Sequence, residues 1–134
     1  MFRRLRILET NYGRDGGWYV EVEGWRLAAL TDCRYYDMFW DNYRLEPLTT
    51  DPAELVRLFA EDFWDRTAIT FRSREFGEVA PHAFPSLVAA QVLEKTGRLP
   101  MRGLYLNVTC YPWDWLIWLL VQISRLIKSS TNRD

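Results

Sequence analysis

Several residue types that commonly build metal and enzyme sites are scarce in this chain of 134 residues. Histidine occurs once, as His82, and the two cysteines, Cys33 and Cys110, lie far apart in the sequence. One histidine and no closely spaced cysteine pair exclude the ligand spacing of zinc sites and leave only carboxylates as metal ligands. The sequence therefore predicts neither a metal site nor a cofactor.

Motifs typical of nucleotide binding and nucleophilic catalysis are also missing. Gly13, Gly16 and Gly17 precede an expected strand, whereas a phosphate-binding loop precedes a helix. The chain contains no Gly-x-Ser-x-Gly motif. These absences favour a protein that is not an enzyme, although a site assembled from scattered residues leaves no such motif.

The chain also lacks an excess of one charge and any long apolar run. Its formal net charge is −1, which disfavours attraction to nucleic acid or to an anionic membrane. The most apolar segment, 113–127, contains Asp114 and is shorter than the ~20 residues that cross a bilayer. The charged start, Met1–Arg6, lacks the apolar core of a signal peptide. We therefore expect a cytoplasmic protein with free thiols.

Aromatic residues are abundant, with 7 Trp, 7 Tyr and 7 Phe. Such side chains bring large apolar area with few torsions to freeze, and they are enriched at interfaces as well as in cores. Seven Trp exceed what the core of so small a domain requires. The composition therefore indicates a binding surface in addition to a core.

The hydrophobic pattern predicts one α+β domain over 1–128, followed by a polar flexible tail over 129–134. An antiparallel N-terminal meander is expected to continue as strand-helix-strand-helix, giving one sheet with about three helices packed on it. The expected strands are 3–10, 18–23, 25–30, 38–45, 67–72 and 104–110, and the expected helices are 51–66, 86–96 and 112–128.

The helix over 112–128 is more apolar than one docking surface requires. At 100° per residue, an aliphatic stripe about 120° wide is expected to dock on the sheet. The stripe comprises Leu116, Ile117, Leu120, Ile123 and Ile127. Trp115, Leu119 and Leu126 lie beyond it, and Trp118 lies farther round. Either a second structural element covers this wider arc, or the arc binds a partner. An interfacial membrane helix is disfavoured because the polar face is not basic.

Aromatic residues also cluster at 35–43, where Phe39 and Tyr43 are expected on one face of a strand. The segment is a central strand covered on both sides, a strand beneath a loop, or an aromatic platform for a peptide, a partner or a stacked ligand. We therefore predict a partner-binding set drawn from this segment and the last helix: Trp115, Trp118, Leu119, Leu126, Phe39 and Tyr43.

The irregular segment 73–85 holds the only candidates for acid–base chemistry, which are Glu75, Glu78 and His82. A lone histidine in a loop is more often an ordinary surface residue. The sequence thus favours a small cytoplasmic protein–protein interaction module of accessory, adaptor or immunity type. It would bind another protein or itself through the C-terminal helix. A small enzyme or ligand-binding domain at 73–85, and a structural homo-oligomer, are the alternatives.

Overall fold

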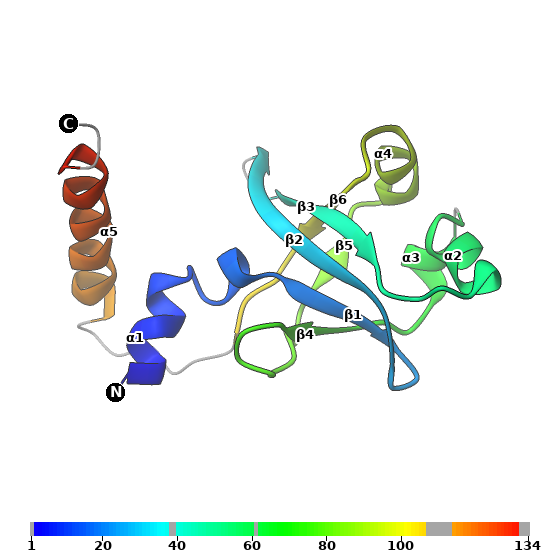
Figure 1. The fold of residues 1–134 in the computed structure, drawn as a ribbon, viewed down its shortest axis with the longest axis horizontal. Helices are drawn as coiled ribbons and strands as arrows, with labels where there is room; N and C mark the ends of the chain where they lie inside the picture. Colours follow the sequence, from blue (N-terminus) through cyan, green and yellow to red (C-terminus); the bar gives the residue numbers. More distant parts are fainter. Residues whose placement is uncertain (1, 38–39, 61, 107–113, 132–134) are drawn as a thin grey trace.

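A six-stranded antiparallel sheet organises the chain, which confirms the predicted α+β class (Figure 1). The computed structural model describes residues 2–37, 40–60, 62–106 and 114–131. The elements follow in the order α1 (Phe2–Glu9), η1 (Arg14–Gly16), β1 (Trp18–Val22), β2 (Trp25–Asp37), β3 (Trp40–Pro47), α2 (Pro52–Leu58), α3 (Phe63–Arg66), β4 (Thr70–Ser73), β5 (Phe84–Pro85), α4 (Ala89–Thr96), β6 (Arg98–Arg102) and α5 (Asp114–Thr131).

The strands lie in the order β4-β1-β2-β3-β6-β5, and neighbouring strands are antiparallel. The predicted turn at Glu23 and Gly24 joins β1 to β2, and both residues have positive φ, as a two-residue hairpin requires. β2 is longer than the expected strand 25–30, because it continues to Asp37 across an irregularity in its pairing with β3. At this irregularity Asp32 has φ 51°, the left-handed conformation found at bulges.

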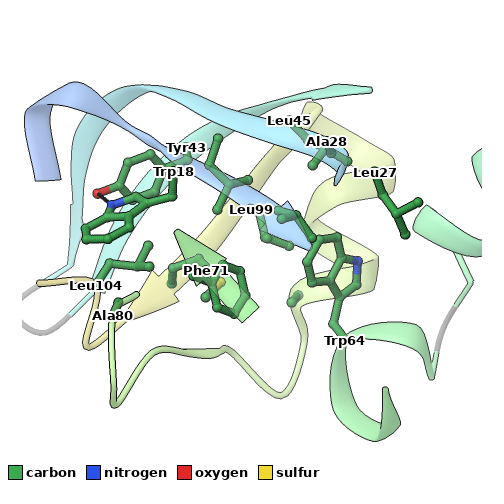
Figure 2. Close-up of a cluster of buried hydrophobic side chains, with 14 of the residues drawn as sticks. Trp18, Leu27, Ala28, Tyr43, Leu45, Trp64, Phe71, Ala80, Leu99 and Leu104 are labelled. Atoms are coloured by element: carbon green, nitrogen blue, oxygen red, sulfur yellow. Dashed lines mark hydrogen bonds between the residues drawn. The ribbon is translucent and has the colours of Figure 1, made fainter. Parts of the chain in front are cut away.

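The core lies against one face of this sheet (Figure 2). Trp18, Val20 and Val22 of β1 are buried together, as their alternation with Tyr19 and Glu21 predicts. Their neighbours in the core come from other strands, from α3 and α4, and from the segment after β6. These neighbours include Leu30, Tyr43, Trp64, Phe71, Leu93, Leu99, Met101 and Leu104.

The prediction of a first strand over 3–10 is wrong, because residues 2–9 form the helix α1. Ile7 and Leu8 are adjacent in sequence and both buried, whereas a strand would turn them to opposite faces. Thr10 ends the helix by hydrogen bonding to the carbonyls of Arg6 and Ile7. Leu and Arg are good helix formers, and two alternating apolar residues were too short a pattern to predict a strand.

The predicted helix over 51–66 consists of two short helices, α2 and α3. Its start is confirmed, since the Asp51 side chain accepts from the Ala53 amide at 3.0 Å and Pro52 follows it. The chain leaves the helical path after Leu58, and the Trp64 indole donates to the Leu58 carbonyl at 3.0 Å. This bond satisfies a carbonyl that the end of α2 leaves unpaired, while Trp64 itself enters the core.

The helix predicted over 86–96 is α4, which spans Ala89–Thr96 and is capped by Gly97. Gly97 has φ 70° and donates to the Leu93 carbonyl, which confirms the predicted C-terminal cap. The strand after it lies earlier than the predicted 104–110. β6 spans Arg98–Arg102, residues 103–106 are not in a strand, and 107–110 fall outside the described residues. Leu104 and Leu106 are both buried, so their spacing reflects burial of a connecting segment.

Arginine side chains cross-link the face of the sheet that lies away from the core. Glu21 is nearly buried between Arg26 and Arg72, which donate to it at 2.9 and 3.0 Å. The Arg26 guanidinium also stacks on the Tyr19 ring, 4.1 Å from its centroid. Around Asp32, three guanidiniums gather in the same manner, from Arg34, Arg44 and Arg98. These contacts use the planar, multi-donor geometry that distinguishes Arg from Lys.

Candidate functional site

The helix α5 stands at one end of the molecule, beside α1 and apart from the sheet (Figure 1). Arg125 fixes it there, because its guanidinium donates to the Glu9 carbonyl and lies 3.7 Å from the Asp15 carboxylate. Burial raises the pKa of Asp15, and the nearby charge of Arg125 opposes that shift. The predicted docking of the aliphatic stripe on the sheet is therefore wrong, and α1 is the main element on which α5 packs.

Most of the apolar surface of α5 faces solvent. Six of its aliphatic residues are between 40% and 71% exposed, and at 100° per residue they fall within about 120° of arc. We call five of them the outer face of α5: Leu116, Leu119, Leu120, Ile123 and Leu126. Ile127, the sixth, is exposed beside them. An amphipathic helix ordinarily buries such a stripe, so the exposed outer face is the feature of α5 that requires explanation.

The opposite arc of α5 is the less exposed one and is also the more polar. Ile117, Val121 and Gln122 are half-buried, and Arg125 on the same arc contacts the end of α1 and the turn that follows it. The helix is thus held to the molecule by its mixed arc and presents its aliphatic arc to solvent. This orientation is what a binding surface requires.

The predicted partner-binding residues of α5 fall on different arcs. Leu119 and Leu126 belong to the outer face, whereas Trp118, though exposed, lies about 100° away from Leu119 around the axis. Trp115 is in the first turn of the helix, and its side chain is outside what the structure describes. The predicted set omits Leu116, Leu120 and Ile123, which are exposed on the outer face, because the sequence assigned them to a contact with the sheet. The apolar stripe gives the same signal whether it packs internally or binds a partner.

The expectation that Tyr43 lies on a binding surface is wrong. Tyr43 is 0% exposed, its hydroxyl accepts from the Trp18 indole at 3.4 Å, and it donates to the Arg14 carbonyl at 3.1 Å. Burial raises the pKa of this phenol far above its usual range. Phe39 lies outside the described residues. The prediction of one strand over 38–45 is also corrected, because the segment 35–43 comprises the end of β2, to Asp37, and the start of β3, from Trp40, and these two ends pair with each other.

Cys33 lies beside this buried phenol and is a free thiol. Burial raises its pKa to about 11, and the hydrogen bond with Tyr43 only partly opposes that shift. A thiol with so high a pKa is almost entirely protonated near neutral pH, and the protonated form is a poor nucleophile. Cys33 packs against the hydrophobic core.

The predicted acid–base candidates contact α1. Glu75 pairs with Arg6 and Glu78 pairs with Arg3, so these carboxylates join the segment after β4 to the first helix. The hydrogen bond and charge of Glu75 raise the pKa of Arg6. His82 is exposed, with its ring 6.5 Å from that of Tyr105. The contacts of Glu75 and Glu78 give them a structural role, in positioning the helix on which α5 rests.

A groove of about 570 Å³ lies between the β1–β2 turn and the start of α2, at the end of the molecule far from α5 (Figure 1). Trp25, which is 75% exposed, forms part of its wall together with Leu48 and the N-terminal turn of α2. The segment 73–85 contributes nothing to the lining of this groove. Trp25 was not among the predicted site residues, because alternation along a strand does not show which aromatic residues are covered.

Two classes of site can be assessed across the part of the chain that the structure describes. Within it, no three His, Cys, Asp or Glu side chains are grouped as a metal site needs. No helix in the same residues has both the length and the apolarity to span a bilayer.

Comparison with known proteins assigns this chain to no family. No family model, no curated protein and no solved structure matches it. Among the surfaces described above, the outer face of α5 is the most distinctive.

Proposed function

We propose that this chain is a small protein–protein interaction module that binds its partner through the outer face of α5. The observation that supports it is the exposure of five aliphatic side chains on one arc of an 18-residue helix. From their exposed fractions, these side chains present on the order of 400–500 Å², and patches of a few hundred Å² on monomers are often functional.

The energetics favour covering this surface. Removing apolar surface from water is favourable by roughly 25 cal/mol per Å², before the losses of association are subtracted. The outer face contains no charged residue that would have to be desolvated. A partner that offers an apolar groove or a second helix therefore fits the face best.

The proposed setting is the reducing cytoplasm. Cys33 is a free, half-buried thiol, and a reducing compartment keeps such a thiol from cross-linking. An accessory or adaptor role, in which the module acts by binding, agrees with the structural use of Glu75 and Glu78.

Affinity purification from the native host tests the proposed interface. The tagged wild-type chain is compared with Leu119→Glu, which places a charge on the outer face, and with Leu87→Glu as the matched control. Leu87 is 91% exposed and lies just before α4, so the control makes the same substitution at a distant site. We expect Leu119→Glu to lose the bound protein and Leu87→Glu to retain it. Equal recovery with both variants would contradict the proposed interface.

The groove at Trp25 supports a second candidate, a ligand-binding domain. Its location differs from the predicted segment 73–85, since Trp25, Leu48 and Asp51 line it. If a small ligand binds here, Trp25→Ala should abolish its binding while His82→Ala leaves it unchanged. Isothermal titration with any candidate ligand separates this possibility from the helical interface, because Leu119→Glu should have no effect on the groove.

A further inference from the structure

We infer that the outer face of α5 pairs with the outer face of a second copy of this chain, in an antiparallel two-fold arrangement. The inference rests on the proposed function, since it names the partner of the same surface. It also makes a stronger statement, because it fixes which residues meet across the interface.

The spacing along α5 is that of a helix–helix seam. Leu116, Leu119, Ile123 and Leu126 are separated by three, four and three residues, which is the a/d repeat of two heptads. Leu120 widens the stripe on one side. All five residues are exposed, so the seam is open to a partner helix over its whole length.

The seam is complementary to itself when one helix is reversed. Centring two antiparallel copies on Val121 places Leu116 opposite Leu126 and Leu119 opposite Ile123, so every a position meets a d position of the other copy. Such matching is what a two-fold interface requires, because each contact occurs twice. The 3-4-3 spacing of a two-heptad seam is symmetric about its own midpoint, so this antiparallel register is available to two copies of α5.

The charge pattern permits the same pairing. In this register the a, d, e and g positions between Trp115 and Ser130 include no Asp, Glu, Lys or Arg. Two copies therefore meet without like charges along the seam, which would otherwise oppose self-association. An interfacial membrane helix would instead need a basic opposite arc, and on α5 Arg125 is bound to the end of α1 and to Asp15.

The area predicts a reversible dimer. Two outer faces together bury on the order of 900 Å², which is below the ~1,200 Å² of stable interfaces and in the range of weak, transient ones. Dimerisation should therefore depend on protein concentration, and it should be sensitive to one buried charge.

A charge-exchange experiment on the full chain tests the second copy and its orientation together. Leu119→Glu and Ile123→Lys are purified separately, and the mass of each is measured by light scattering across a concentration series, alone and as an equimolar mixture. Wild type should form a dimer, each variant alone should weaken it by at least about 100-fold, and Leu87→Glu should dimerise like wild type. Urea unfolding of each variant confirms that it folds.

The mixture gives the sharpest result. In the antiparallel register, the carboxylate introduced by Leu119→Glu meets the ammonium group introduced by Ile123→Lys. At the second contact, the unchanged Ile123 of the first variant still meets the unchanged Leu119 of the other. The mixture should therefore recover a heterodimer. A parallel pairing would leave each charge against an aliphatic residue, so a mixture that stays monomeric overturns the proposed arrangement.

Four other outcomes overturn the second copy. Wild type that is monomeric at every concentration does so directly. Wild type that instead co-sediments with phosphatidylglycerol–phosphatidylcholine vesicles, with Leu119→Glu failing to do so, assigns the face to a membrane. A monomeric wild type that captures a host protein through Leu119 excludes the second copy and leaves the proposed function standing. A monomeric wild type whose capture of a host protein is unchanged by Leu119→Glu overturns both the second copy and the proposed function.

Discussion

Two helices of similar amphipathic character behave in opposite ways in this molecule. α4 buries Ala89 and Leu93 against the sheet, and Leu93 is 1% exposed. α5 carries more large aliphatic residues, yet its outer face is exposed and its mixed arc contacts α1. An apolar stripe thus shows that a helix has a surface to cover, while the connections of the chain decide whether the sheet or a partner covers it. We expect side chains on α4 to control folding and side chains on the outer face of α5 to control association.

The largest loss of stability is expected for a substitution in α4, the helix whose apolar side is buried. Leu93→Ala removes core contacts between α4 and the sheet and should lower the free energy of unfolding by about 2–5 kcal/mol. Urea unfolding followed by circular dichroism measures the loss. A change below about 0.5 kcal/mol, the usual scale of surface substitutions, would show that α4 docks no better than α5 does.

The second-largest loss of stability is expected at the ion pairs that Glu21 makes on the sheet. Glu21→Gln removes the charge that Arg26 and Arg72 share and should cost about 1–3 kcal/mol. Burial alone would raise the pKa of Glu21, but the hydrogen bonds and charges of the two arginines lower it. Because the folded-state pKa is lowered, the contribution is complete above the usual carboxyl pKa of about 4.3 and is lost as the pH falls through the folded value.

That pH dependence is measured by comparing wild type with Glu21→Gln from neutral pH downwards. The difference in unfolding free energy should shrink as the pH falls below about 4.3. A difference that stays constant through this range would contradict the proposed role of the ionised carboxylate.

The end of α4 provides a smaller test. Gly97 has φ 70°, and a Cβ placed on it would contact nothing nearby, so Gly97→Ala should cost only the strain of a left-handed residue. We expect a loss of about 1 kcal/mol. The melting temperature should fall by a few degrees, and unchanged stability would show that this end of α4 does not hold the left-handed cap.

The smallest loss of global stability is expected where Arg125 attaches α5 to the rest of the molecule. Arg125→Ala removes the contacts to the Glu9 carbonyl and Asp15, both at the surface, and should lower global stability by less than about 1 kcal/mol. Hydrogen exchange should nevertheless become faster in α5 relative to α4, because local opening needs less energy than global unfolding. Equal acceleration in both helices would mean that α5 is part of the cooperative core.

The elements with local signals could be predicted from the sequence. The turn at Glu23 and Gly24, the cap at Asp51 and the end of α4 at Gly97 each depend on a few neighbouring residues. The predictions that failed depended on contacts between residues that are not close neighbours in the sequence. The Trp64 indole bonds to the Leu58 carbonyl at the end of α2, and the ion pairs of Glu75 and Glu78 with α1 link residues far apart in the sequence.

The candidate site shows the same limit. The sequence located the apolar helix and predicted that it carries more apolar surface than a single contact covers. It could not show which arc contacts the rest of the chain, because periodicity gives the positions of apolar residues relative to one another and not to the sheet. Leu116, Leu120 and Ile123 were consequently assigned to the fold, whereas the structure exposes them.

Urea unfolding of Leu119→Glu tests the central claim most directly, at a protein concentration low enough to keep the chain monomeric. If the outer face of α5 contributes to association and not to folding, the free energy of unfolding should stay within about 0.5 kcal/mol of wild type. A loss of about 3 kcal/mol or more would mean that Leu119 is buried within the fold, and it would contradict the account of α5 as a binding surface.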